Sequence, residues 1–103
     1  NLRVMSYLKS DMGVDDDAVS AWYAHWIDEA FSAAEQLVDP RGPYCYGEKV
    51  SMADAYLVPQ VYNARRFNVP LDVYPKLVAI TDACNELQAF RDAAPENQSD
   101  ANA

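Results

Sequence analysis

A long periodic run of apolar residues follows three consecutive aspartates and predicts an amphipathic helix. Residues 15–17 are aspartates, and negative charge there stabilises a helix N-terminus. The apolar positions form one stripe at helical spacing, which a second set widens: Val19, Trp22, Trp26, Ala30, Ala33 and Leu37, then Ile27, Phe31, Ala34 and Val38. We expect the two tryptophans to be core or interface aromatics. Residues 39–43, with two prolines and a glycine, end the helix.

Two shorter segments have the same kind of pattern. Residues 2–12 carry apolar residues at helical spacing, and Gly13 is a suitable stop. A later helix begins at Tyr74-Pro75, because proline is well placed in a first turn. We expect Phe90 to close the core, and the inner face of this later helix to be Leu77, Ile80, Cys84 and Leu87.

A further helix begins at Ser51 and ends near Phe67–Asn68. Ser51 and Asp54 have the spacing of a capping box, with aspartate in place of the usual glutamate or glutamine. We therefore expect both residues to be structural caps, with Asp54 buried. Pro59 should bend the helix without ending it, because apolar residues keep the helical period beyond it.

These elements predict an all-α fold, a bundle of about five helices. The aromatic segment 44–47 is expected to be a loop whose rings pack on the core. No alternation of strands and helices occurs along the chain. We expect residues 1–92 to form one helical domain and residues 93–103 to form a flexible, solvated tail, because polar residues and proline dominate there.

Charge and hydropathy limit the partners that the chain can have. Sixteen acidic against eight basic residues give a net charge of −8, which argues against nucleic acid because phosphate binding needs clustered lysine and arginine. No apolar run reaches the roughly 18 residues of a membrane helix, so we expect no membrane partner. The first residue is asparagine and no signal segment follows, so we expect the chain to begin partway through a longer protein.

Several residues that could carry chemistry have simpler structural explanations. Cys45 and Cys84 lack the spacing of a disulfide scaffold or a zinc site, which fits buried thiols in a reducing, cytoplasmic setting. His25 and Glu29 share a helix face, but a third metal ligand is not evident, so we expect no metal. The aspartates at 15–17 lack the glycine and terminal glutamate of a calcium loop.

Arg65 and Arg66 are the one adjacent basic pair. Arg66 lies four residues after Tyr62, so it shares a face with Tyr62 and Asn63, whereas Arg65 points elsewhere. A guanidinium beside an amide and a phenol suits a planar carboxylate. Two surface arginines favoured by a helix C-terminus are the simpler explanation on spacing alone, although the spacing leaves both open.

The segment around these residues resembles a known family. Residues 51–61 read S-M-A-D-A-Y-L-V-P-Q-V and residues 62–68 read Y-N-A-R-R-F-N. This order is similar to the L-V-P-Q-V and N-A-x-R-F motifs of zeta-class glutathione transferases, the maleylacetoacetate and maleylpyruvate isomerases. Residues 1–4, 44–47 and 74–75 match further segments of that family, so the likeness covers nearly the whole chain.

The resemblance implies the helical C-terminal half of a two-domain, homodimeric enzyme. A thioredoxin-like domain outside this chain would bind most of the glutathione and carry the catalytic groups, leaving none here. The reaction implied is glutathione-dependent cis–trans isomerisation of a maleyl keto acid. By position, Arg66 would hold a substrate carboxylate, while Asn1 and Arg3 would line the same cleft.

Two other functions remain open at this point. The same scaffold is used by glutathione transferases that conjugate electrophiles, and related helical domains serve as interaction modules without catalysis. Which maleyl acid would be preferred is not determined by these residues.

Overall fold

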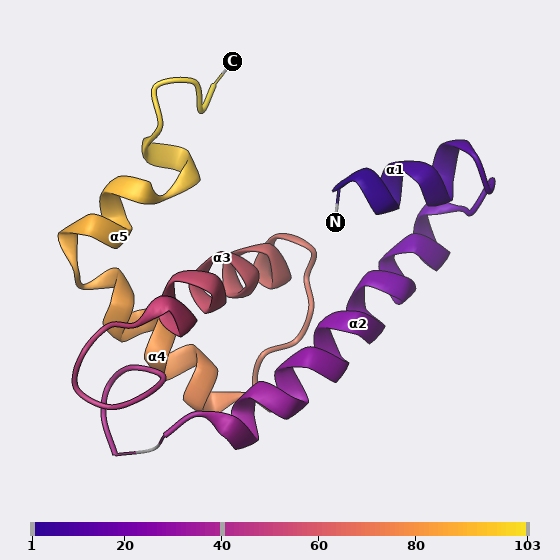
Figure 1. Ribbon diagram of the computed structural model, residues 1–103. Coiled ribbons are helices and arrows are strands. Elements are labelled where there is room, and N and C mark those ends of the chain that lie inside the picture. Colours follow the sequence, from indigo (N-terminus) through magenta and orange to yellow (C-terminus); the bar gives the residue numbers. More distant parts are fainter. Residues whose placement is uncertain (1, 40, 103) are drawn as a thin grey trace.

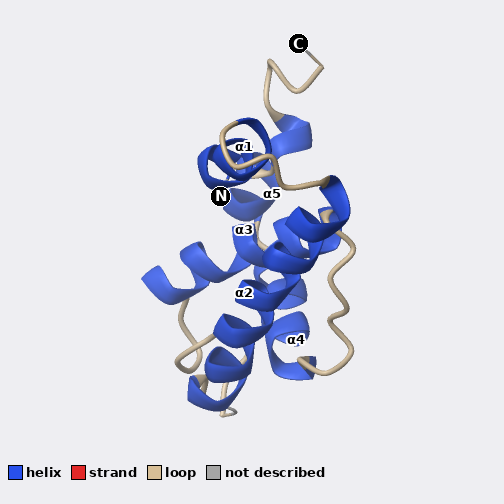
Figure 2. Ribbon diagram, turned by 90° about the vertical axis from the view of Figure 1, so that its right-hand side faces the viewer, coloured by secondary structure: helices blue, strands red, loops and turns tan. Residues whose placement is uncertain are grey.

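The computed structural model describes residues 2–39 and 41–102. Five α-helices and a short 3-10 helix follow one another (Figure 1): α1 Leu2–Ser10, α2 Asp16–Leu37, α3 Met52–Arg66, α4 Pro75–Asn85, α5 Gln88–Ala93 and η1 Pro95–Asn97. Within these residues the chain has helices and loops, one isolated bridge between Tyr44 and Gly47, and no strand (Figure 2). The predicted all-α bundle of about five helices is confirmed.

Helix α4 lies at the centre of the packing. It contacts α2, α3 and α5, whereas α1 packs on α2 at the far end of the molecule (Figure 1). The structure is thin, with extents of 46 × 35 × 20 Å and a radius of gyration of 15.2 Å. A compact domain of this length would have a radius of gyration of about 13 Å. The helices therefore form a flattened layer with large open faces.

The buried face of α2 differs from the main apolar stripe that the sequence predicts. The buried residues are Val19, Tyr23, Ile27 and Phe31, four residues apart, and they face the other helices. Trp26 and Leu37, from the predicted stripe, are 54% and 69% exposed. The helix is apolar on two sides, and hydrophobic periodicity does not tell which side meets α4 and the end of α3.

The helix that begins at Pro75 is shorter than its periodicity indicates. It ends at Asn85, and Leu87 adopts an extended conformation before α5 begins. The Arg91 guanidinium donates to the carbonyls of Asn85 and Glu86, which lie at the open end of α4. No glycine or proline lies at this break, so the apolar periodicity predicted a single helix through it.

Helix α3 ends in a left-handed residue that fixes the position of its last turn. Asn68 has a φ of 58°, and the Val69 N–H donates to the Ala64 carbonyl at 2.9 Å. Pro59 lies inside α3, and the helix continues through it as predicted. Arg66 is thereby held as the last residue of the helix.

The C-terminal segment folds back on α5. Asn97 donates through its amide to the Arg91 carbonyl at 2.6 Å, and Gln98 donates to the Asp92 carbonyl at 2.8 Å. The mobility expected of residues 93–103 stays a prediction. No helix among the described residues has the length and hydropathy required to span a bilayer.

Candidate functional site

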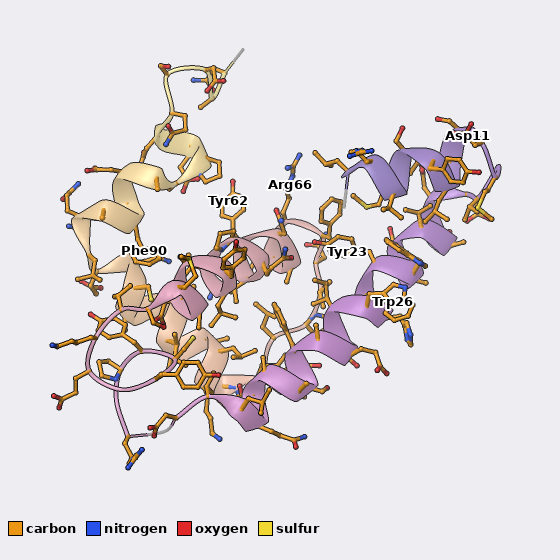
Figure 3. All side chains as sticks on the ribbon, in the orientation of Figure 1. Asp11, Tyr23, Trp26, Tyr62, Arg66 and Phe90 are labelled. Atoms are coloured by element: carbon orange, nitrogen blue, oxygen red, sulfur yellow. The ribbon has the colours of Figure 1, made fainter. Side chains whose placement is uncertain are left out.

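Arg66 projects from the last turn of α3 to the same side as Tyr62 (Figure 3). Its guanidinium carbon lies 5.8 Å from the centroid of the Phe67 ring, a cation–π distance. Asn63, half-buried one turn earlier, belongs to the same strip of polar side chains. The arrangement presents a planar cation beside an amide and a phenol, the groups that can hold a carboxylate.

Two hollows meet at Arg66. One, of about 480 Å³, opens toward α1 and α2 and includes Lys9, Ser20 and Tyr23 in its wall. The other, of about 860 Å³, lies between α3, α4 and α5 and includes Tyr62, Asn63 and Phe90. Arg66 contributes to both walls. A cation at this junction can bind an anion that enters from either side.

The two arginines differ in their partners. Arg65 extends toward α4, where its Nη2 lies 3.7 Å from Asp82 Oδ1. Over residues 2–39 and 41–102, Arg66 makes no ion pair. As the spacing predicts, the two side chains take different directions. Arg65 also lines the wider hollow but is directed toward Asp82, whereas Arg66 borders both hollows without an ion-pair partner among the described residues.

The other residues predicted for the cleft are placed less favourably. Arg3 is exposed on α1 and lies in the wall of neither hollow. Asn1 lies outside the described residues. Lys9 enters the wall instead, although its Nζ is already paired with Asp16 Oδ1 at 2.8 Å, and this pairing lowers the pKa of Asp16.

Tyr23 was not identified by sequence reasoning. It lies among the apolar positions of α2, stacks with its ring centroid 4.4 Å from that of Phe67, and is 2% exposed. Its hydroxyl is buried without a hydrogen-bond partner among the described residues. Contact between α2 and the end of α3 places Tyr23 in the wall of the hollow. Such a contact cannot be predicted from the local sequence pattern.

Ser51 and Asp54 lie at the opposite end of α3, where they cap the helix. The Asp54 carboxylate accepts from Cys45 N at 2.8 Å, Ser51 N at 2.9 Å and Ser51 Oγ at 3.2 Å. Burial raises its pKa, but the hydrogen bonds from Cys45 and Ser51 outweigh that effect and hold the pKa below its usual value. Asp54 is a buried, ionised cap that joins the loop to the helix.

Cys45 and Cys84 are both buried, and their thiols are free. Burial, together with the neighbouring Asp54 carboxylate, raises the pKa of each thiol to about 12. Neither can supply a thiolate at neutral pH. They pack against the buried cap, and Cys84 Sγ lies 3.7 Å from Asp54 Oδ1.

The single histidine contacts a neighbouring aromatic ring. His25 lies on the exposed side of α2, with its ring edge-on to Trp26 at a centroid distance of 4.8 Å. Across the part of the chain that the structure describes, no three histidine, cysteine, aspartate or glutamate residues are grouped to hold a metal ion.

Comparison with known proteins identifies close relatives. No protein-family model matches the chain. The maleylpyruvate isomerase of Ralstonia sp is 50% identical over 103 residues, which cover 97% of this chain and 49% of that protein. A Vibrio cholerae protein named "probable maleylacetoacetate isomerase" is 47% identical over 102 residues, covering 98% of this chain and 47% of its own length. The chain spans about half the length of the relatives it matches.

Solved structures agree with this assignment. A maleyl pyruvate isomerase described as a bacterial glutathione S-transferase of the zeta class superposes with a TM-score of 0.92 and 48% identity, over 97% of this chain and 49% of that one. The maleylacetoacetate isomerase of Anaeromyxobacter dehalogenans, with bound dicarboxyethyl glutathione and citrate in its active site, gives 0.89 at 36% identity, over 98% of this chain and 45% of that one. The chain is therefore homologous, along nearly its whole length, to the helical C-terminal half of zeta-class glutathione transferases, the maleylacetoacetate and maleylpyruvate isomerases.

Proposed function

We propose that this chain is the substrate-binding helical domain of a glutathione-dependent cis–trans isomerase acting on maleylacetoacetate or maleylpyruvate. The observation that carries the proposal is the 47–50% identity, along nearly the whole chain, to relatives with these names. Arg66 supports it, since its guanidinium is the unpaired cation at the junction of two hollows.

The chemistry of such a substrate fits the surroundings of Arg66. A maleyl keto acid is a dianion with a flat unsaturated segment, so it needs a cation for a carboxylate and an apolar surface for that segment. Arg66 provides two parallel N–H donors, and Phe90 and Tyr62 provide apolar surface in the wider hollow. Holding the substrate in one orientation is the share of catalysis that we assign to this domain.

Glutathione is proposed as the cofactor, and it would supply the thiol that adds reversibly to the substrate double bond. The relative that holds dicarboxyethyl glutathione in its active site supports this proposal. Cys45 and Cys84, with pKa values of about 12, offer no thiolate of their own. Residues outside this chain, in a thioredoxin-like domain, would therefore bind most of the glutathione and activate its thiol.

The remaining features of the proposed protein follow from the same assignment. Residues 1–92 would be the helical domain, and Asn1 and Arg3 would approach the substrate once the second domain is in place. The whole protein would be a homodimer. Two buried free thiols are consistent with a reducing compartment, for which we propose the cytoplasm.

A chimera tests the activity directly. The matched half of the Ralstonia relative is replaced by this chain, and the purified chimera is assayed with glutathione and maleylpyruvate, with the relative itself as control. We expect isomerisation, and we expect maleylpyruvate to be preferred over a chloroaromatic electrophile. Conjugation of the chloroaromatic alone would favour a general transferase. A folded chimera that is inactive on both would favour an interaction module.

A further inference from the structure

Arg66 is an exposed side chain at the end of a helix, and it makes no ion pair among the described residues. A long side chain of this kind samples many rotamers in water. Fixing it on a ligand therefore costs conformational entropy, which lowers the affinity. The strength with which Arg66 can hold a carboxylate thus depends on what orients its guanidinium before the ligand arrives.

The contact that orients Arg66 comes from the next residue in the chain. The Arg66 guanidinium carbon lies over the Phe67 ring, 5.8 Å from the ring centroid. Within about 6 Å, the face of an aromatic ring attracts a cation. The N–H donors of a guanidinium lie in its plane. A guanidinium held over a ring can therefore keep its paired donors free for a carboxylate.

The end of α3 makes this contact possible. Inside a continuous helix, adjacent residues do not face each other. Helix α3 ends at Arg66, and Phe67 leaves the helical conformation with a φ of −96° and a ψ of 13°. The Phe67 N–H still donates to the Asn63 carbonyl at 3.0 Å, and Asn68 then adopts its left-handed φ of 58°. The backbone on both sides of Phe67 is thereby fixed.

Tyr23 of α2 packs on the Phe67 ring. The two ring centroids lie 4.4 Å apart, with 39° between the ring planes. Tyr23 is 2% exposed, and its hydroxyl is buried without a hydrogen-bond partner among the described residues. Figure 3 shows Tyr23 directed from α2 toward the end of α3 that carries Arg66. Because a buried hydroxyl without a partner adds no stability, the ring is the part of Tyr23 that serves here.

We propose that Phe67 and Tyr23 are positioning residues for the substrate carboxylate. The Tyr23 ring fixes the Phe67 ring, the Phe67 ring fixes the plane of the Arg66 guanidinium, and Arg66 alone of the three binds the anion. The inference rests on the carboxylate-binding role proposed above for Arg66. It adds that the affinity of the site depends on two uncharged rings, one of them from a different helix.

Two ligands test the inference in the chimera with the Ralstonia half. Dicarboxyethyl glutathione carries two carboxylates that glutathione lacks, so the ratio of the two dissociation constants isolates their contribution. Both constants are measured by isothermal titration calorimetry. Phe67→Leu should weaken binding of dicarboxyethyl glutathione about 3- to 10-fold, the range of a cation–π contact, and leave glutathione binding unchanged. Tyr23→Leu should act in the same direction and by less, because it acts through Phe67.

Matched variants separate positioning from packing. Phe67→Tyr and Tyr23→Phe keep the two rings and should retain most of the affinity that the leucine variants lose. Phe31→Leu removes a similarly buried ring from α2, one that packs edge-on against Tyr74 at a centroid distance of 5.6 Å. It should lower the melting temperature as Tyr23→Leu does, and it should leave both dissociation constants unchanged.

Combination with Arg66→Gln shows whether the rings act through the guanidinium. Arg66→Gln alone should weaken binding of dicarboxyethyl glutathione. Adding Phe67→Leu to it should change the affinity by less than about twofold, because the group that the ring orients is no longer there. A loss from Phe67→Leu that is equally large with and without Arg66 would assign the effect to folding and overturn the inference.

Two other results would also overturn it. If Arg66→Gln weakens binding of dicarboxyethyl glutathione and Phe67→Leu does not, Arg66 stays in the site and the rings do not position it. If Arg66→Gln has no effect, both the inference and the role proposed for Arg66 are withdrawn. The expected binding pattern in a chimera that does not isomerise maleylpyruvate would sustain the inference and count against the proposed function.

Discussion

The Asp54 carboxylate accepts a hydrogen bond from the backbone N–H of Cys45 at 2.8 Å, across nine residues of chain. The same side chain accepts from Ser51 N at 2.9 Å, so one buried group joins the loop after α2 to the start of α3. It is fully buried against Cys84 of α4. The stability of the domain should therefore depend strongly on this carboxylate.

Replacing Asp54 with alanine should lower the free energy of unfolding by about 3 kcal/mol, because two backbone N–H groups lose their acceptor. Asp54→Asn keeps one acceptor oxygen and should cost less. Urea unfolding followed by circular dichroism measures both, with the exposed Asp72→Asn as the control. Equal stability of Asp54→Ala and the parent would contradict the role assigned to this group.

The same carboxylate predicts a dependence of stability on pH. Its pKa in the folded protein lies below the ordinary value of 3.8, because the hydrogen bonds from Cys45 and Ser51 outweigh burial. The stabilisation is therefore complete above about pH 4, and it is lost as the pH falls through the lowered folded pKa. Unfolding free energies measured between pH 2 and 6 should show this acid limb, with a shallower slope in Asp54→Asn.

Glu35 on α2 caps the start of α4, which has no capping side chain of its own. Its carboxylate accepts from Lys76 N at 2.9 Å and Leu77 N at 3.0 Å. Glu35→Ala should therefore lower the free energy of unfolding by about 1–2 kcal/mol. The neighbouring exposed Gln36→Ala should change it by less than about 0.5 kcal/mol. Thermal and urea unfolding compare the two, and similar losses in both would remove the cap from the explanation.

Substitutions of Arg65 and Arg66 should affect the activity of the chimera with the Ralstonia half differently. Arg66→Ala should lower kcat/KM for maleylpyruvate about 10- to 100-fold, the usual effect of losing a charged hydrogen bond to a carboxylate. Arg65→Ala should have little effect, because its guanidinium is directed toward Asp82. Arg66→Lys keeps the charge without the two parallel donors and should recover activity only in part. Unchanged kinetics in Arg66→Ala would remove this residue from the site.

The cysteines should be unreactive while the protein is folded. With pKa values of about 12 and full burial, Cys45 and Cys84 have almost no accessible thiolate at pH 8. A thiol reagent added at pH 8 should label neither in buffer and both in denaturant. Rapid labelling of the native protein at either position would contradict the burial described here.

The sequence by itself determined helices α1 to α3, the start of α4 and the capping of α3. The three-residue spacing of Ser51 and Asp54 predicts the cap of α3. Gly13, which has a left-handed φ of 66°, predicts the stop after α1. The separate directions of Arg65 and Arg66 also followed from helical spacing. The family followed from the order of its motifs.

Tertiary structure decided which faces are used. Helix α2 is apolar on two sides, so periodicity could not choose between the face of Tyr23 and the face of Trp26. Contact with α4, and with Phe67 at the end of α3, chose the former. The cap at the start of α4 depends on Glu35, which is 41 residues from Lys76 in the sequence. The hollows around Arg66 likewise exist only where helices distant in sequence meet, and local patterns carry no information about such contacts.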